Sequence, residues 1–166
     1  MPVTQHILNN FSSAPNYIET GTDNGVSLEK AINSGYKNII TIDILECAHT
    51  RKKFESNSNV KFVKGSSSEV LWDLIKDINS QIVFYLDAHI CGDEAKDLPV
   101  LSELDTIAKH HIKNHIIILD DVRLFKDMKL DIDVVTKKLK QINPDYVIWF
   151  ADDEVAPRDL LICNIM

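Results

Sequence analysis

Cysteine, aromatic side chains and basic residues are all scarce in this sequence. Its three cysteines, Cys47, Cys91 and Cys163, include no CxxC pair, which argues against a disulfide framework and against a structural zinc site. Only 18 Lys and Arg residues stand against 25 Asp and Glu, giving a net charge of −7. Nucleic-acid backbones are bound largely through Lys and Arg, so this balance argues against a nucleic-acid partner. We expect a small molecule or a carbohydrate instead.

Two kinds of targeting segment are also missing. No apolar run approaches the roughly 18 residues of a membrane span. The start MPVTQHILNN lacks the basic and apolar regions of a secretory signal. We therefore expect a cytoplasmic protein with no membrane span. The 166 residues, 45% of them hydrophobic, are enough for one domain with a sizeable core, which we expect to span residues 1–166.

The chain repeats a pattern of a short apolar run, a turn and an amphipathic segment. The apolar runs are rich in Ile, Val, Phe and Tyr, as strands are, and the amphipathic segments have helical spacing. Alternation of this kind predicts an α/β fold, in which helices cover both faces of a parallel sheet. The expected strands are 16–20, 38–43, 60–65, 82–88 and 115–121, and the expected helices are 27–35, 47–56, 67–78, 98–111 and 131–142.

The alternation of apolar runs and amphipathic segments ends near the C-terminus. Two apolar runs, 145–151 and 159–166, are joined by the short link DDEVAPR. A link this short allows a hairpin but not a crossover, so the last strand should run antiparallel to its neighbour.

Glycines and an acid mark the end of the first expected strand, in the sequence ETGTDNGVS (19–27). In an open parallel sheet, ligands bind beyond the carboxyl ends of the strands. Gly21 and Gly25 allow a tight turn and a close approach of the backbone to a ligand. A tight turn alone would explain these glycines, but Glu19 places a charge at the end of a buried strand, where a charge needs a specific reason.

The second and third strand ends carry Asp43 and the segment KGSSS (64–68). Asp43 could accept hydrogen bonds from both hydroxyls of a ribose, or it could cap the next helix. The hydroxyls of Ser66 and Ser67 could likewise contact an adenine edge or cap a helix.

The fourth and fifth strand ends bring an acid and an imidazole, Asp87 and His89, and an acid pair, Asp120 and Asp121, to the same edge. Clustered carboxylates repel one another, and either raised pKa values or a divalent cation relieves the repulsion. Oxygen ligands suit Mg²⁺, Mn²⁺ or Ca²⁺ better than Zn²⁺. Helix caps and half-exposed surface charge are the alternative explanation for these four residues.

Three further histidines lie near the end of the fourth expected helix. Because no supporting hydrogen-bond partners can be argued for them, we expect surface positions flanking the helix end rather than a metal site. They are His110, His111 and His115.

Taken in order, YIETGTDNGVS, Asp43, GSS and YLDAH resemble the class I S-adenosylmethionine (SAM)-dependent methyltransferases over nearly the whole chain. Residues 19, 21 and 25 match the E/D-x-G-x-x-x-G pattern of that family's first loop. The resemblance implies a Rossmann-like, doubly wound, mostly parallel seven-stranded sheet of order 3-2-1-4-5-7-6 with the last strand antiparallel. It also implies that the glycine loop passes the methionine part of the cofactor, while Asp43 holds the ribose and the Ser66 region lies by the adenine. The cofactor-binding residues implied in this way are Glu19, Gly21, Thr22, Gly25, Ser27, Asp43, Ser66, Ser67 and Asp87.

The acids also make the chain similar to metal-dependent O-methyltransferases, in particular the macrocin-type sugar O-methyltransferases. By that resemblance Asp87, Asp120 and Asp121 bind a divalent cation, Mg²⁺ or Mn²⁺, which holds the hydroxyl oxygens of the acceptor. The base in the macrocin group is an acid two residues after the first ligand, where this chain has His89. A neutral imidazole with a pKa of about 6.5 is a competent base, so His89 is expected to be catalytic together with Asp87. Arg123 could help His89 to bind the substrate, or it could neutralise the acidic edge.

The expected reaction is SN2 methyl transfer from SAM to a sugar hydroxyl, such as that of a deoxyhexose like rhamnose in a glycan or glycosylated metabolite, assisted by the cation. A catechol-like small molecule is the alternative acceptor, although an aromatic content of 7% mildly favours the sugar. A non-catalytic nucleoside-binding module is a further alternative. The missing GxGxxG spacing argues against an NAD-dependent oxidoreductase.

The first expected strand begins at residue 16, which leaves little sequence before it that could serve as a lid. We therefore expect an open acceptor site. Such a site would suit a large glycan, a homodimer partner, or a place as one module of a larger glycan-modifying protein.

Overall fold

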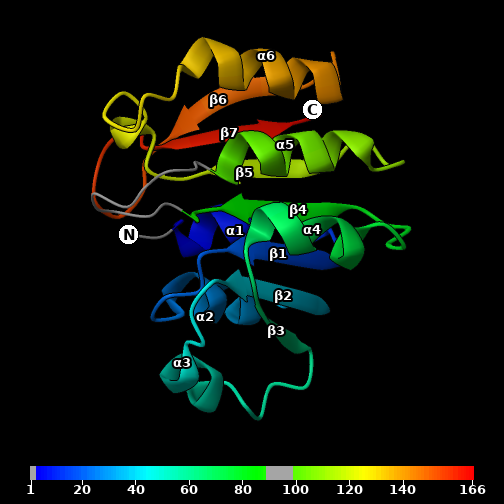
Figure 1. Cartoon of the computed structure of the whole chain (residues 1–166), viewed down its shortest axis with the longest axis vertical. Coiled ribbons are helices and arrows are strands. Elements are labelled where there is room, and N and C mark those ends of the chain that lie inside the picture. Colours follow the sequence, from blue (N-terminus) through cyan, green and yellow to red (C-terminus); the bar gives the residue numbers. More distant parts are fainter. Residues whose placement is uncertain (1–2, 89–98) are drawn as a thin grey trace.

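A computed structural model describes residues 3–88 and 99–166. They form a seven-stranded sheet of order β3-β2-β1-β4-β5-β7-β6, with helices on both faces (Figure 1). The strands are β1 Asn16–Thr20, β2 Asn38–Asp43, β3 Val60–Lys64, β4 Ile82–Leu86, β5 Ile116–Leu119, β6 Val147–Ala151 and β7 Leu160–Asn164. The helices are α1 Gln5–Phe11, α2 Val26–Asn33, α3 Ala48–Lys53, α4 Ser67–Ile75, α5 Pro99–Lys109 and α6 Ile132–Ile142, with a 3₁₀ turn η1 at Val122–Leu124.

The strand pairings confirm the predicted topology. The four pairs β1–β2, β2–β3, β1–β4 and β4–β5 are parallel. β7 runs antiparallel to both β5 and β6, so the link between β6 and β7 does form a hairpin. The chain therefore has the doubly wound α/β fold, the strand order and the antiparallel last strand that were expected.

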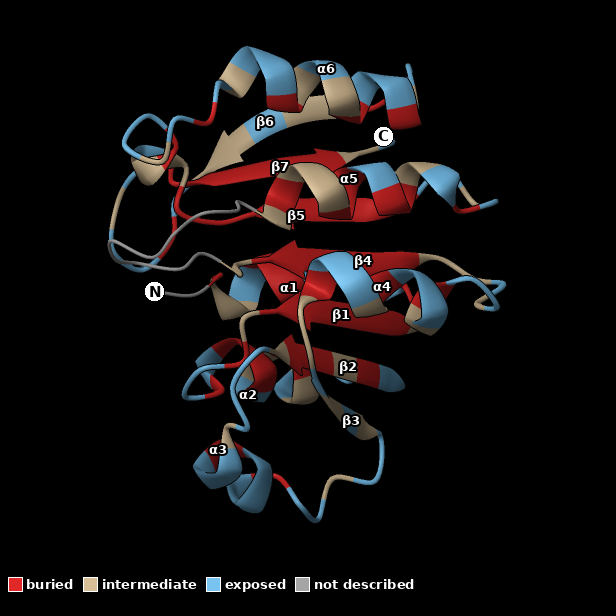
Figure 2. Ribbon diagram, viewed as in Figure 1, coloured by how far each residue is buried: buried red, intermediate tan, exposed pale blue. Residues whose placement is uncertain are grey.

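Two apolar layers hold the helices to the sheet. Side chains along a strand alternate between its two faces, so Ile18 of β1 lies in the core beneath α4, α5 and α6, and Tyr17 lies in the core beneath α1 and α2. Figure 2 shows the four central strands β1, β4, β5 and β7 almost wholly buried, while the outer strands β3 and β6 are partly exposed. Strands buried on both faces explain the continuous apolar runs in the sequence.

Helix α1 was not predicted. The side chain of Thr4 caps it by accepting a hydrogen bond from the Ile7 backbone N–H at 3.3 Å. Ile7 and Leu8 then bury their side chains in the core shared with α2. None of the helices in the described part of the chain has the length and apolar character of a membrane span.

Candidate functional site

The carboxyl ends of the parallel strands meet at one edge of the sheet, on the left in Figure 1. Thr20, the last residue of β1, pairs in register with Ile42 of β2 and with Leu86 of β4. Leu86 in turn pairs with Leu119 of β5. The polar or glycine residues that leave the sheet together at this edge are Gly21, Asp43, Asp87 and Asp120.

The turn after β1 brings the backbone of β1 against that of β4. Gly21 has a φ of +89°, and its N–H donates to the Ile42 carbonyl oxygen at 2.8 Å. A Cβ atom on Gly21 would lie 2.4 Å from the carbonyl oxygen of Asp87, so no side chain fits here. Gly25, with a φ of +72°, is the N-cap residue of α2, and a Cβ there would lie 2.5 Å from Thr50 Cγ2. Both glycines are required by close approach as well as by backbone conformation.

Asp43 ties this turn to the end of β2. Its Oδ2 accepts hydrogen bonds from the backbone N–H groups of Thr22 (2.9 Å) and Asp23 (3.1 Å), and its Oδ1 accepts one from Leu45 (2.8 Å). It does not cap α3, since the N-cap of that helix is Cys47. The carboxylate therefore stands at the edge of the sheet, next to the glycine turn, as a ribose ligand would need to.

Glu19 lies beneath the turn and not on its surface. It is fully buried, and its oxygens accept hydrogen bonds from Tyr17 Oη (3.1 Å) and Thr41 Oγ1 (2.7 Å). Thr41 Oγ1 also lies 2.6 Å from Thr22 Oγ1, so the Thr22 hydroxyl points inward too. Burial raises the pKa of the Glu19 carboxyl to about 7, against the opposing effect of hydrogen bonds from Thr41, Ser27 and Tyr17. Glu19, Thr22 and Ser27 thus support the turn from within.

The start of α4 carries the two serines predicted near the adenine. Ser66 is the N-cap residue, but its side chain makes no cap hydrogen bond, and Ser67 is buried in the first turn. Behind them lies Glu103 of α5, a buried acid that was not predicted as a site residue. Burial raises the pKa of the Glu103 carboxyl to about 7, while the Ser67 and Thr20 hydroxyls act to lower it.

The acids after β4 and β5 share a partner, Tyr85. Its hydroxyl donates a hydrogen bond to Asp120 Oδ2 and lies 3.3 Å from Asp87 Oδ2. Burial raises the pKa of the Asp87 carboxyl to about 8, and the charges of Asp120 and Asp121 add to this rise. Burial also raises the pKa of Asp120 to about 6, although its hydrogen bond from Tyr85 acts to lower it. Asp87, Asp120 and Asp121 thus lie near enough to interact electrostatically, which contributes to the raised pKa values of Asp87 and Asp120.

Two further acids from the β6–β7 link join this edge. Asp121 is the N-cap residue of η1, and its Oδ1 pairs with Arg123 Nη1 at 2.8 Å. The same Arg123 nitrogen contacts Asp159, which directly precedes β7. Among the described residues, one group of three acids brings carboxylate oxygens within 4.8 Å of one another, and it consists of Asp120, Asp153 and Asp159. This group shares Asp120 with the predicted cation ligands, and its other two members, Asp153 and Asp159, were not predicted.

The histidines divide into three cases. His89, the expected base, lies outside the described residues. His111 is exposed, as expected. The surface position expected for His110 and His115 is wrong, because both are fully buried and His115 Nε2 lies 2.8 Å from His110 Nδ1. Since the Ile82 N–H donates to His115 Nδ1, Nε2 of His115 carries the proton that bonds to His110. The pair joins β4 to the end of α5, away from the candidate site.

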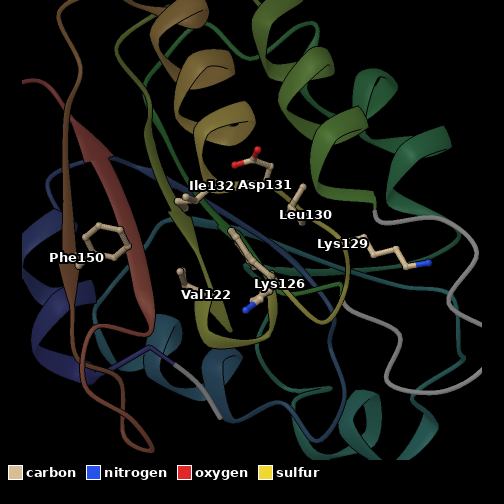
Figure 3. Close-up of a pocket in the computed structure, with 8 residues that line it drawn as sticks. Val122, Lys126, Lys129, Leu130, Asp131, Ile132 and Phe150 are labelled. Carbon is tan, nitrogen blue, oxygen red and sulfur yellow. The ribbon is translucent and has the colours of Figure 1, made fainter.

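A pocket of about 590 Å³ opens beside the acidic edge (Figure 3). It is bounded by η1, the start of α6 and β6, and Val122 in its wall directly follows Asp121. Its lining is mostly apolar, and two lysines and one acid supply the charged groups. Its volume is in the range of small-molecule sites. The lining residues are Val122, Phe125, Lys126, Lys129, Leu130, Asp131, Ile132 and Phe150.

No family model and no curated protein matches the chain, but solved structures do. A methyltransferase from Streptococcus mutans described as putative, in complex with SAH, matches with a TM-score of 0.67 and 14% identity, over 100% of this chain and 99% of that one. A SAH-bound methyltransferase from Podospora anserina gives 0.65 and 15%, over 98% and 77%. The O-methyltransferase TomG from Streptomyces achromogenes, in complex with SAM, gives 0.65 and 13%, over 98% and 78%. At these identities the likeness shows the fold, which is the Rossmann-like fold of these methyltransferases.

Proposed function

We propose that this chain is a SAM-dependent O-methyltransferase that transfers a methyl group to a sugar hydroxyl with the assistance of a divalent cation. The observation that carries the proposal is the adjacency, at one sheet edge, of a glycine turn with no room for a side chain and a group of buried acids. The shared fold supports it, since similar structures are those of methyltransferases in complex with SAM or SAH.

The residues around the glycine turn fit SAM. Gly21 lets the turn after β1 pack against the Asp87 backbone, at the strand ends where ligands bind in an open parallel sheet. The Asp43 carboxylate accepts three hydrogen bonds from backbone N–H groups and interacts with the Cys47 thiol, and its position beside this turn supports it as the ribose ligand. The Ser66 hydroxyl, which makes no cap hydrogen bond, supports the predicted contact with adenine.

The acids at β4 and β5 fit a divalent cation. Asp87, Asp120 and Asp121 offer only carboxylate oxygens, which suit Mg²⁺ or Mn²⁺. With a pKa of about 8, Asp87 holds a proton at neutral pH, and it would release that proton on binding a cation. When bound, SAM supplies a sulfonium methyl group and the cation supplies positive charge beside the acceptor oxygens. In the proposal Asp87 orients the acceptor hydroxyl and His89 takes up its proton.

The pocket beside η1 supports an acceptor with a partly apolar surface. A deoxyhexose has a methyl group in place of one hydroxyl, and this methyl and the C–H faces of the ring gain from contact with apolar side chains. Phe125, Leu130 and Phe150 supply such contacts, and Lys126 and Lys129 offer donors for sugar hydroxyls.

The test is methyl transfer from SAM carrying a deuterated methyl group to a panel of acceptors, followed by mass spectrometry. The panel contains a rhamnoside, a second deoxyhexoside and a catechol, each with Mg²⁺ and with a chelator. We expect transfer to a deoxyhexoside that requires Mg²⁺ and falls at least about a hundredfold in His89→Ala, the loss expected for a general base. The matched control is His111→Ala, which removes an exposed imidazole and should change nothing.

The other outcomes are equally informative. Transfer to the catechol alone would overturn the sugar assignment and keep the enzyme class. Binding of SAM without transfer to any acceptor would favour the non-catalytic nucleoside-binding module.

A further inference from the structure

The short link between β6 and β7 lies at the same edge as the candidate site because β7 is antiparallel. Leu160 pairs with Ala151, so the link spans residues 152–159 and leaves the sheet where β6 ends and β7 begins. β7 also pairs with β5, with Leu161 opposite Leu119. This register brings acids from a remote part of the sequence beside Asp120.

Three buried carboxyl groups meet there. Asp120, Asp153 and Asp159 are 0%, 9% and 1% exposed, and each offers an oxygen within 4.8 Å of the others. Burying carboxylates this close together is unfavourable unless positive charge or proton donors compensate them. The arrangement therefore requires a compensating group.

The contacts of Asp153 leave one oxygen without a partner. Its Oδ1 accepts hydrogen bonds from the backbone N–H groups of Val155 (2.7 Å) and Ala156 (2.5 Å), which fix the carboxylate. Its Oδ2 is buried and has no hydrogen-bond partner within residues 3–88 and 99–166. A buried carboxylate oxygen that is held in place without a donor calls for a partner such as a cation.

Arg123 compensates the edge only in part. Its guanidinium pairs with Asp121 and Asp159, and its backbone N–H donates to Asp159 Oδ1 at 2.8 Å. A single positive charge thus faces these two carboxylates, and the buried Asp153 adds a third acid close to Asp159. The Arg123 side chain is 38% exposed, so it can move outward without breaking the core.

We infer that Asp153 and Asp159 complete, with Asp120, a binding site for a hard divalent cation of the Mg²⁺ or Mn²⁺ type. The all-oxygen donor set selects such ions over Zn²⁺. Arg123 occupies the approach to this site and competes with the cation for Asp159. The inference deepens the proposed function, on which it rests for the use of the cation in catalysis, by assigning ligands to the β6–β7 link that the sequence pattern did not indicate.

The test is titration of Mn²⁺ into the full chain, with free Mn²⁺ followed by electron paramagnetic resonance and with neither SAM nor acceptor present. Asp153→Asn keeps the oxygen that accepts from Val155 and Ala156 and removes the charge. It should weaken Mn²⁺ binding by at least about tenfold, and Asp159→Asn should do the same. The matched control is Asp152→Asn, which removes an exposed charge from the same link. Arg123→Gln should tighten binding, because it removes the competing charge.

Two results of the Mn²⁺ titration would overturn the inferred cation site. Absence of Mn²⁺ binding by the wild type at millimolar concentration overturns the inference, and so does an Asp153→Asn variant that binds as the wild type does. Circular dichroism of each variant at the titration temperature shows whether it is folded, and protection of the wild type against thermal unfolding by Mn²⁺ is a second readout. Methyl transfer that needs Mg²⁺ but is unchanged in Asp153→Asn would leave the proposed function standing and overturn these ligands alone.

Discussion

Replacement of Gly21 by alanine should damage both the fold and the cofactor site. The new Cβ would lie 2.4 Å from the Asp87 carbonyl oxygen, well inside van der Waals contact, and the φ of +89° is a conformation that alanine rarely adopts. Overpacking of a rigid site costs about 1 to 3 kcal/mol, and the left-handed backbone costs about 1 to 2 kcal/mol more. We therefore expect the free energy of unfolding to fall by about 2 to 5 kcal/mol.

Gly35 is the matched control for this substitution. It has a similar φ of +81°, but a Cβ there would meet nothing within 4 Å. Gly35→Ala should therefore cost only the backbone strain, about 1 kcal/mol. In a chain of this size, each kcal/mol of lost stability lowers the midpoint of thermal unfolding by roughly 2 to 4 °C. The midpoint should therefore be about 5 to 15 °C lower in Gly21→Ala and only a few degrees lower in Gly35→Ala.

The assays are thermal unfolding followed by circular dichroism and calorimetric titration of SAM into each folded variant. The added methyl group should displace the turn and cost about 1.4 kcal/mol of the free energy of SAM binding, so Gly21→Ala should bind SAM about tenfold more weakly. Gly35→Ala should bind SAM as the wild type does. Equal losses of stability in the two variants would refute the reasoning, because the contact between Gly21 and the end of β4 would then carry no energy.

Three other substitutions test the buried polar groups. Burial, aided by the charge of His110, lowers the pKa of His115 to about 3 in the folded chain. Below about pH 6.5 the unfolded chain therefore binds a proton at His115 that the folded chain does not bind. The free energy of unfolding, measured by urea denaturation, should fall as the pH drops from 6.5 toward 3, and it should fall less in His115→Gln. For Glu103 the folded pKa of about 7 lies above the ordinary 4.5, so ionisation destabilises the fold as the pH rises; Glu103→Gln should gain up to about 3 kcal/mol at pH 8 and nothing at pH 4, and equal gains at both would contradict the assignment. Tyr85→Phe removes a hydrogen bond that lowers the pKa of Asp120, so a carboxyl-carbon NMR titration should show that pKa raised further, and an unchanged value would mean that Tyr85 does not hold this acid.

Much of the fold could be predicted because its signals are local. Buried strands such as 82–86 appear as unbroken apolar runs, and the short link after residue 151 requires a hairpin. Gly21 and Asp43 stand immediately at strand ends, so a parallel sheet brings them together whatever the details of packing. The acids after β4 and β5 could be placed by the same argument.

The remaining features depend on contacts between distant segments. Glu103 looks like any polar residue of an amphipathic helix, and its burial arises only from the packing of α5 against α4 and β1. Asp153 and Asp159 read as parts of a polar link, and only the register of β7 against β5 and β6 brings them to Asp120. His110 and His115 look like surface residues until their bond to each other is seen. Helix α1 depends on burying Ile7 and Leu8 against α2 and has little helical signal of its own.

The central claim is that the edge formed by β1, β2 and β4 binds SAM. Its most direct test is calorimetric titration of SAM into the wild type with and without Mg²⁺, repeated with Asp43→Ala and with Asp23→Asn as the control. Asp23 shares the turn, but its side chain is exposed and bonds only to Asn24 among the described residues. We expect micromolar binding that is lost in Asp43→Ala and kept in Asp23→Asn. An absence of SAM binding by the wild type under both conditions would contradict it.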